Sequence, residues 1–291
     1  MGLRFCSFAS GSTGNCYLVR SDDTALLVDC GISGKRIVEA LGGRGLDPRD
    51  ISGVLITHEH TDHTQSIRVV SKKADNAGFY ATRGTIKALS DRVPLERFTP
   101  IRRTDAFTIG DIDVRSFGLF HDASEPVGYS FTAGGRTLSI VTDTGIVTDG
   151  IYDAIKDSDA LVLEANHEVN ILRAGPYPYE LQQRILSDFG HLSNVTAGEV
   201  ICRILDDRKD RADRERGSAD IGSRSADDDS MQTEEHDIPY VLLAHISRHN
   251  NTPYQAELTV QNILFEHGYL PDRDIRMSTA SYNEIGPDIE V

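Results

Sequence analysis

Residues 51–63, ISGVLITHEHTDH, decide the fold that the sequence predicts. The apolar run predicts a β-strand, and side chains two apart in a strand point to the same side, so His58 and His60 form a pair of metal ligands at its end. As the chain then turns into a helix, Asp62 and His63 can reach the other side of the same cavity and bind a second ion. A polar surface turn is the alternative, but this density of metal-binding side chains after an apolar strand favours a two-metal site.

The composition is that of an ordinary globular domain. The chain has 291 residues, of which 39% are hydrophobic, and we expect a single domain over residues 1–291. It has no run of about 18 apolar residues and no signal-peptide pattern at its start, so we expect a cytoplasmic protein that does not enter membranes. The cysteines form no CxxC pair, which predicts buried free thiols at Cys6, Cys16, Cys30 and Cys202.

The formal net charge of −15 opposes non-specific adhesion to nucleic acid or to an anionic membrane. Any polyanionic substrate therefore requires a local positive field, which counts mildly against a nuclease. The basic residues that could supply this field include Lys35, Arg36, Arg102 and Arg103, although nothing in the sequence shows that they converge.

Short apolar runs alternate with helical segments along the chain, which predicts a mixed α/β fold with helices covering the sheets. Strands are expected at residues 3–8, 16–20, 24–31, 51–57, 79–82, 112–119, 128–132, 137–142, 160–164 and 240–244. Helices are expected at residues 34–41, 63–74, 85–90, 148–156, 178–188, 194–205 and 253–267.

Residues 206–237 differ from the rest of the chain in composition. They are densely charged and contain almost no large apolar side chain, which predicts a disordered, solvated insertion. The alternative is a mobile arm that touches a polyanionic substrate through basic residues, but acidic residues are interleaved among these. The basic residues are Arg208, Lys209, Arg211, Arg214 and Arg216.

The segment HEHTDH at residues 58–63 matches without substitution the HxHxDH motif of the metallo-β-lactamase superfamily. The chain resembles this superfamily in order over nearly its whole length outside residues 206–237. The resemblance implies an α/β fold of a particular kind, a four-layer αββα sandwich of two mixed sheets flanked by helices. It also implies that Asp29, in Asp29-Cys30-Gly31, orients the ligand loop from behind.

The same resemblance assigns further ligands at the ends of later strands. His121 in GLFHDASEP, Asp143 in SIVTDTG and His245 in YVLLAHISRHN match the family pattern, with His249 as the competitor of His245. The implied ligand set is His58, His60 and His121 on one ion, Asp62, His63 and His245 on the other, and Asp143 between them. For such a nitrogen-rich site we expect two divalent ions, with zinc as the default and manganese or iron also admitted.

Two ions held about 3.5–4 Å apart can activate water and polarise the bond that it attacks, so hydrolysis is the predicted chemistry. Asp62 is expected to be essential for turnover. The segment between His121 and Asp143 is too short for the exosite arm of tRNase Z enzymes. The segment from Asp143 to His245 is too long for a glyoxalase II arrangement and too short for the clamp domain of RNase J.

Two motifs between Asp143 and His245 are shared with nuclease branches of the superfamily. LVLEANHE carries Glu164 and His167, and GHLSN carries His191. By this resemblance Glu164 and His191 are candidates for the general acid that protonates the leaving oxygen, and His167 is a candidate substrate contact. A salt bridge for Glu164 and a helix cap for His191 are the structural alternatives.

Taken together, the motifs are most similar to the YycJ/WalJ-type exonuclease branch. This resemblance implies that the substrate is DNA, which is hydrolysed in the 5′-to-3′ direction. RNA is not excluded as a substrate. Hydroxyl and amide groups of the glycine-bearing loop are candidate phosphate donors, namely Ser10, Ser12, Thr13 and Asn15, and a simple hairpin loop is the alternative. A small-molecule hydrolase of the same fold, acting on a cyclic phosphodiester, lactone or thioester, is the alternative function.

Overall fold

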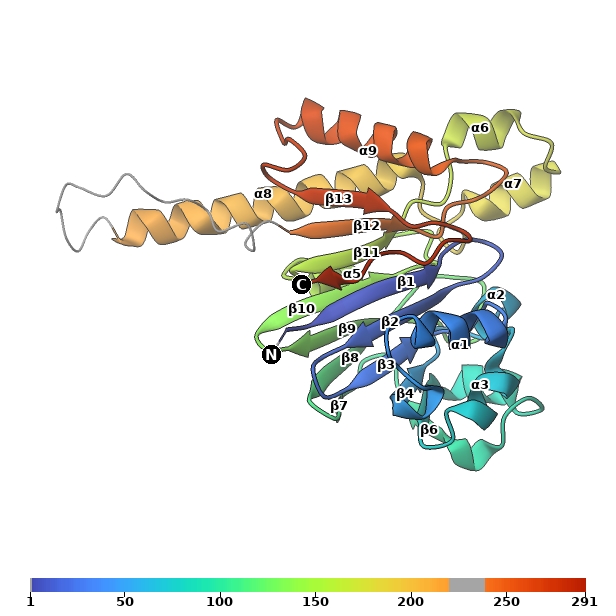
Figure 1. The fold of residues 1–291 in the computed structure, drawn as a ribbon. Helices are drawn as coiled ribbons and strands as arrows, with labels where there is room; N and C mark the ends of the chain where they lie inside the picture. Colours follow the sequence, from blue (N-terminus) through green and yellow to red (C-terminus); the bar gives the residue numbers. More distant parts are fainter. Residues whose placement is uncertain (1, 220–238) are drawn as a thin grey trace.

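The fold is built from two β-sheets that face each other and from helices on their outer sides (Figure 1). The computed structural model describes residues 2–219 and 239–291. Each sheet has seven strands. The layers follow the order helix, sheet, sheet, helix, so the four-layer αββα sandwich expected from the sequence is confirmed.

The first sheet combines an antiparallel meander with parallel crossovers. Its strands are β1 (Arg4–Ala9), β2 (Cys16–Arg20), β3 (Ala25–Val28), β4 (Ile51–Leu55), β5 (Gly78–Thr82), β6 (Phe98–Ile101) and β14 (Ile289–Glu290). They lie in the order β14-β1-β2-β3-β4-β5-β6. Strands β1 to β3 pair antiparallel, whereas β3 to β6 pair in parallel and therefore need longer crossover connections.

The second sheet repeats this combination. Its strands are β7 (Ala106–Ile109), β8 (Ile112–Gly118), β9 (Val127–Ala133), β10 (Arg136–Val141), β11 (Ala160–Glu164), β12 (Tyr240–Ala244) and β13 (Arg276–Thr279). They lie in the order β13-β12-β11-β10-β9-β8-β7. Strands β7 to β10 are antiparallel and β10 to β13 are parallel, so both sheets carry a parallel half.

Side chains along a strand are buried alternately in two different cores, because successive residues point to opposite faces. In β3, Leu27 packs toward the outer helices, while Leu26 and Val28 pack between the sheets. In β11, Leu163 packs outward and Val162 packs between the sheets. Each such buried side chain contributes about 1.5–3 kcal/mol, so a one-residue slip that exchanged the faces is strongly disfavoured.

Helices cover the outer faces of both sheets. The first sheet is covered by α1 (Gly34–Gly42) and α3 (Ile67–Lys73), and the second by α5 (Asp149–Ile155), α8 (Asn194–Ala219) and α9 (Pro253–Glu266). The shorter helices are α2 (Thr61–Thr64), α4 (Arg83–Leu89), α6 (Val169–Ala174), α7 (Tyr179–Ile185), η1 (Pro48–Asp50) and η2 (Leu95–Arg97). Within the described ranges, no helix combines the length and the apolar character that a membrane span requires.

Polar side chains gather where parallel strands of both sheets end. Asp29 follows β3, His58 lies shortly after β4, Asp143 lies shortly after β10, Glu164 ends β11, and His245 follows β12. Parallel neighbours end at the same edge of a sheet, and ligand sites of α/β folds lie at such edges. The two sheets therefore bring these side chains to one place.

Two helix predictions were wrong. The helix expected over residues 63–74 is interrupted between α2 and α3, because the chain turns at Ser66. The N–H and the hydroxyl of Ser66 both donate to the Cys30 carbonyl, each at a distance of 3.0 Å. The disordered insertion expected from residue 206 was wrong for residues 206–219, which continue α8 beyond the sheets (Figure 1). The remainder of that expectation, residues 220–237, lies outside the described residues.

Polar anchors explain why α8 continues where the apolar pattern stops. The Tyr152 hydroxyl donates to the carboxylate of Asp207 over 2.7 Å, and the Arg208 guanidinium donates to the Ser158 carbonyl. The residues beyond are mostly alanine, arginine and acidic residues, several of which have high helix propensity. Hydrophobic periodicity carries no signal of such contacts, so the sequence alone did not reveal the extension.

We expect Arg208→Ala to lower the free energy of unfolding by about 1–2 kcal/mol, because it removes a partly buried cation and its hydrogen bond to the body of the protein. The matched change Arg214→Ala, on the exposed part of the same helix, should shift it by less than about 0.5 kcal/mol. Urea unfolding followed by circular dichroism measures both. Equal effects of the two changes would show that α8 is not anchored through Arg208.

Candidate metal centre

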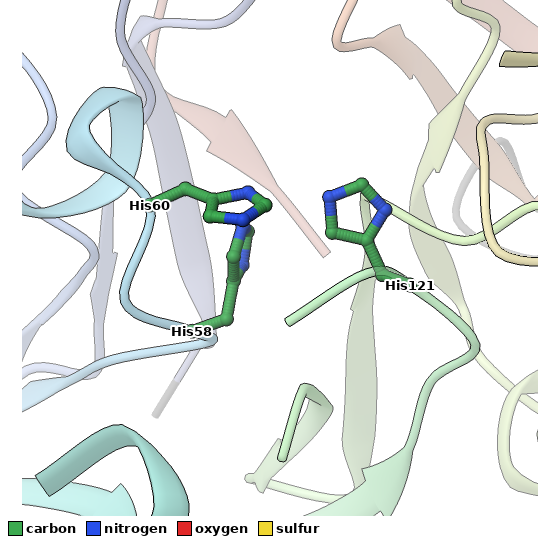
Figure 2. A group of neighbouring side chains, drawn as sticks. All are labelled: His58, His60 and His121. Atoms are coloured by element: carbon green, nitrogen blue, oxygen red, sulfur yellow. The ribbon is translucent and has the colours of Figure 1, made fainter. Parts of the chain in front are cut away.

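Three imidazoles from two loops form one part of the site (Figure 2). His58 and His60 lie on the loop after β4, and His121 faces them from the loop after β8. The ring centroids of His121 lie 5.2 Å from His58 and 5.1 Å from His60, and those of His58 and His60 are 4.6 Å apart. One ring nitrogen from each lies within 4.8 Å of the others, which suits a single ion.

A second group of ligand atoms lies beside the first. The Asp62 carboxylate is 3.6 Å from Nε2 of both His63 and His245. Asp143 lies between the groups, with Oδ2 3.0 Å from His63 Nε2 and Oδ1 3.7 Å from His121 Nε2. The structure thus brings the seven residues of the implied ligand set close together, and the trios of the two implied sites are each among the groups that could hold an ion.

Several of these residues have a backbone conformation that is unusual for residues with a side chain. Asp29, Asp143 and His245 have φ values of 60°, 63° and 51°, in the left-handed region. Aspartate and histidine tolerate this region better than most residues, at a cost of about 1–3 kcal/mol each. Each lies at the end of a strand, where the left-handed turn redirects the chain at the edge shared by both sheets.

The donor set fits divalent cations. His58 Nε2 and His245 Nε2 are buried and have no hydrogen-bond partner among the described residues. Burial alone would raise the pKa of Asp143, but the charges of His245 and His63 hold it well below its usual range. Burial would lower the pKa of His245, yet Asp143, Asp62 and Glu164 raise it to about 10. These carboxylates therefore favour positive charge beside them, which a divalent cation bound to the same ligands would provide.

Asp29 supports the ligand loop from behind, as the resemblance implied. Its carboxylate accepts from Thr57 N over 2.9 Å and from the Thr57 hydroxyl over 2.8 Å, and Oδ2 lies 2.7 Å from His63 Nδ1. The His63 Nδ1–H is held by this carboxylate, which leaves Nε2 for a metal. At Gly31 a Cβ atom would lie 1.6 Å from the Asp62 carbonyl, so glycine is required for the two loops to approach.

A cavity of about 190 Å³ adjoins the ligands on the side of His121. Residues from five parts of the chain line it, including Ser12, Asn166, Tyr177, His191 and Asn250. The cavity provides the space beside the metal ligands in which part of a substrate can lie.

Some residues of the glycine-bearing loop are buried and support the metal-ligand loops, whereas others are exposed. Asn15 is fully buried, its Oδ1 accepts from Gly11 N over 2.9 Å, and its Nδ2 lies 3.0 Å from His63 Nε2. Ser10 is also buried and accepts from His245 N over 2.7 Å. Both side chains support the ligand loops, so the roles of Ser10 and Asn15 as phosphate donors stay predictions that this burial disfavours. Ser12 is exposed and lines the cavity, as a substrate contact must.

Glu164 and His191 lie together beside the ligands. Glu164 Oε1 is 2.8 Å from His191 Nδ1 and 2.7 Å from His245 Nδ1, and Oε2 accepts from the backbone N–H groups of Thr144 and Leu192. Burial alone would raise the pKa of Glu164, but His191 and His245 lower it to about 2. These contacts suit a carboxylate that orients His191 and His245, so the general-acid role of Glu164 stays a prediction that its hydrogen bonds disfavour. His191, 20% exposed, keeps access to the cavity.

Two other histidines were considered from the sequence. His167 is 1% exposed, burial lowers its pKa to about 4, and it is not among the residues that line the cavity. Its role as a direct substrate contact stays a prediction that this burial disfavours. His249 belongs to none of the ligand groups in the described residues, and its ring lies 5.9 Å from that of Tyr177.

One supporting residue was missed although it stands inside the decisive stretch. Glu59 Oε1 accepts from both the N–H and the hydroxyl of Ser124, over 2.7 Å and 2.6 Å. This contact ties the loop of His58 and His60 to the loop that carries His121. Its only signal in the sequence is an acidic residue between two ligands, which is equally typical of an exposed position.

A family model described as a beta-lactamase superfamily domain matches residues 24–209, a range that contains every proposed ligand except His245. The chain belongs to this superfamily. Within it, the chain is 35% identical over 289 residues to exodeoxyribonuclease YycJ of Bacillus anthracis, covering 96% of this chain and 98% of that protein. It is 34% identical over 269 residues to exodeoxyribonuclease WalJ of Streptococcus pneumoniae, covering 91% and 89%.

A solved structure agrees with this membership. The metallo-beta-lactamase fold protein YhfI of Bacillus subtilis matches 100% of both chains with a TM-score of 0.67 at 15% identity. An identity this low supports the shared fold only. The superfamily fold and the histidine and aspartate groups together identify the site as one for divalent metal.

We expect Asp29→Asn to weaken metal binding about 10–100-fold, because the amide cannot replace the carboxylate that orients His63. Asparagine tolerates the left-handed backbone, so the fold should remain. The matched control is Asp272→Asn, which changes another aspartate with a positive φ of 62° outside the site. Competition with a chromophoric chelator measures the affinity, and an unchanged value in Asp29→Asn would contradict the assigned role.

Proposed function

We propose that this protein is a metal-dependent exonuclease that hydrolyses DNA stepwise from its 5′ end. The observation that carries the proposal is His191, which the buried carboxylate of Glu164 holds beside the metal ligands and which lines the cavity. A proton donor in this position suits the alkoxide that leaves when a phosphodiester is cleaved. The two relatives that match most of the chain are named exodeoxyribonucleases, and we extend this substrate class to the present chain.

The proposed cofactors are two zinc ions. The ligands would be His58, His60 and His121 for one ion, Asp62, His63 and His245 for the other, and Asp143 between them. Nitrogen-rich sets of this kind favour zinc, and the carboxylates also admit manganese. When bound, the ions supply Lewis-acid chemistry, which activates water and neutralises charge on the phosphate that it attacks.

The residues of the chain divide the remaining tasks. With its Nδ1–H donated to Glu164, His191 would act as the acid in its imidazolium form, in which Nε2 also carries a proton that the leaving oxygen can receive. Glu164 is a positioning residue, since it is fully buried and accepts from both His191 and His245. Asp62 is 24% exposed and completes the ligand set on the open side. Ser12, at the mouth of the cavity, is the donor that reaches substrate.

The basic residues named in the sequence analysis as possible contacts of a DNA strand have partners within the chain. These are Lys35, Arg36, Arg102 and Arg103. Lys35 pairs with Glu39, Arg102 pairs with Asp105, and Arg36 and Arg103 donate to backbone carbonyls. Their contact with a DNA strand therefore stays a prediction. When bound, the metal ions would add positive charge next to the scissile phosphate.

We also propose that the protein works in the cytoplasm. Its cysteines are buried and free, as expected from the sequence: Cys6, Cys16, Cys30 and Cys202. Free thiols are typical of a reducing compartment, where disulfides do not persist.

We expect the zinc-loaded or manganese-loaded protein to shorten end-labelled, 5′-phosphorylated DNA progressively from the 5′ end. Asp62→Ala should abolish this activity, because it opens one ligand set. Gel analysis of single-stranded and double-stranded DNA, with RNA alongside, measures the products. Inert nucleic acid combined with cleavage of a cyclic phosphodiester, lactone or thioester would overturn the proposal in favour of a small-molecule hydrolase.

We expect His191→Gln to lower kcat on DNA about 10²–10⁴-fold without loss of bound metal, because the general acid is removed. The same change should have little effect on bis(p-nitrophenyl) phosphate, whose leaving group needs no proton. His267→Gln, at an exposed position after α9, is the control. A parallel loss on both substrates would contradict a proton donor and indicate a role of His191 in metal binding.

A further inference from the structure

The cavity beside the metal ligands has two chemically different walls. One wall is formed by the segment before and along α7 and is largely apolar, with Tyr177, Leu181 and Ile185. Tyr177 is half-buried, and its backbone carbonyl accepts from the Gln182 side chain over 2.9 Å. This bond fixes the backbone of Tyr177, whose ring centroid lies 5.9 Å from that of His249. An aromatic ring lining a cavity can serve as a platform on which a nucleobase of any sequence stacks.

The other wall carries amide and hydroxyl groups. It includes Asn166, Ser247 and Asn250. Asn250 is 1% exposed, and its side-chain oxygen is buried with no hydrogen-bond partner among the described residues. An unpaired buried acceptor costs about 1–3 kcal/mol unless a ligand donates to it. Hydroxyl groups of a sugar and amino groups of a base are donors of this kind.

The charges around the cavity argue against a second phosphate inside it. Its arginine, Arg184, is ion-paired with Asp122, which also lines the cavity. Among the described residues that line the cavity, the other groups that can carry positive charge are His121 and His191, which lie beside the metal ligands. The space of about 190 Å³ is below the roughly 300–1,000 Å³ of pockets that enclose drug-sized ligands, so it suits one uncharged unit.

The position of His191 fixes which part of the substrate enters. His191 lines the cavity and is the proposed donor to the leaving oxygen, so the leaving group lies on the cavity side of the metals. A cavity of limited size accepts a leaving group only if it is the end of a strand. The continuing strand must then lie on the opposite, open side of the ligands.

We propose that this cavity binds the sugar and base of the terminal nucleotide that is released, with Tyr177 stacking on the base and Asn250 accepting from it or from its sugar. This inference rests on the proposed exonuclease function. Water attacks the phosphorus, the bond from phosphorus to the O3′ atom of the terminal nucleotide breaks, and His191 protonates that O3′. The shortened strand keeps the phosphate as a new 5′-phosphate. In the next round this phosphate, on O5′ of the terminal nucleotide, would lie outside the cavity, which holds only the sugar and base.

The test compares single-stranded DNA with a normal 5′-terminal nucleotide and DNA in which that nucleotide is an abasic tetrahydrofuran residue. A third substrate carries the abasic residue at an internal position several nucleotides away, and a fourth carries it at the 3′ end. We expect wild type to remove the terminal abasic residue about tenfold more slowly in kcat/KM, because one stacked base is lost, and to remove the normal end of the internally modified strand at the usual rate.

Variants then test whether Tyr177 causes the preference for a terminal nucleotide that carries a base. Tyr177→Ala should lose it, removing normal and abasic ends at the same reduced rate, while Tyr177→Phe should retain it. The matched control is Tyr179→Ala, because Tyr179 is 70% exposed and does not line the cavity. Bound metal and melting temperature, measured for each variant, exclude loss of the centre or of the fold.

Each outcome decides between the hypotheses. If wild type degrades DNA but removes abasic and normal ends equally, or if Tyr177→Ala keeps the preference, the cavity assignment fails while the exonuclease function stands. If the preference follows a 3′-terminal abasic residue, the leaving group was assigned to the wrong end of the strand and the proposal is overturned. If wild type leaves all DNA intact, the proposed function itself fails.

Discussion

The metal centre depends on how the two sheets pack against each other. The ligands of residues 58–63 come from the first sheet, whereas His121, Asp143 and His245 come from the second. The apolar layer between the sheets fixes the distance between these two halves. Functional sites tolerate displacements of only about 0.5 Å. A change in the packing of this layer would therefore also change the distances between the ligands of the two sheets.

Backbone strain is concentrated where the chemistry lies. Three strands are followed by residues with positive φ, and each of these residues is either a proposed metal ligand or supports one. Such conformations persist only when the surroundings determine them strongly. Here the parallel strands beneath provide that support, since they are buried on both faces and held by neighbours on both sides.

The sequence predicted the fold, and the family resemblance implied ligands that the structure places close together, because the motifs lie at strand ends. A run such as residues 51–57 identifies its own strand, and the histidines that follow have few structural roles. The burial of Asn15 and the saturation of Glu164 by four hydrogen-bond donors could not be predicted, because they arise from contacts between distant segments. The same is true of α8, whose continuation rests on polar anchors to other elements.

The pairing of β14 with β1 has a consequence for the behaviour of the protein in concentrated solution. Residues Arg4 and Phe5 pair with Glu290 and Ile289, and Val291 N donates to the Leu3 carbonyl over 2.9 Å. Without this cover, β1 would present a row of unpaired backbone groups, which is a template for strand addition by another molecule. Protection of the first sheet against aggregation thus rests on a short segment that contains no metal ligand.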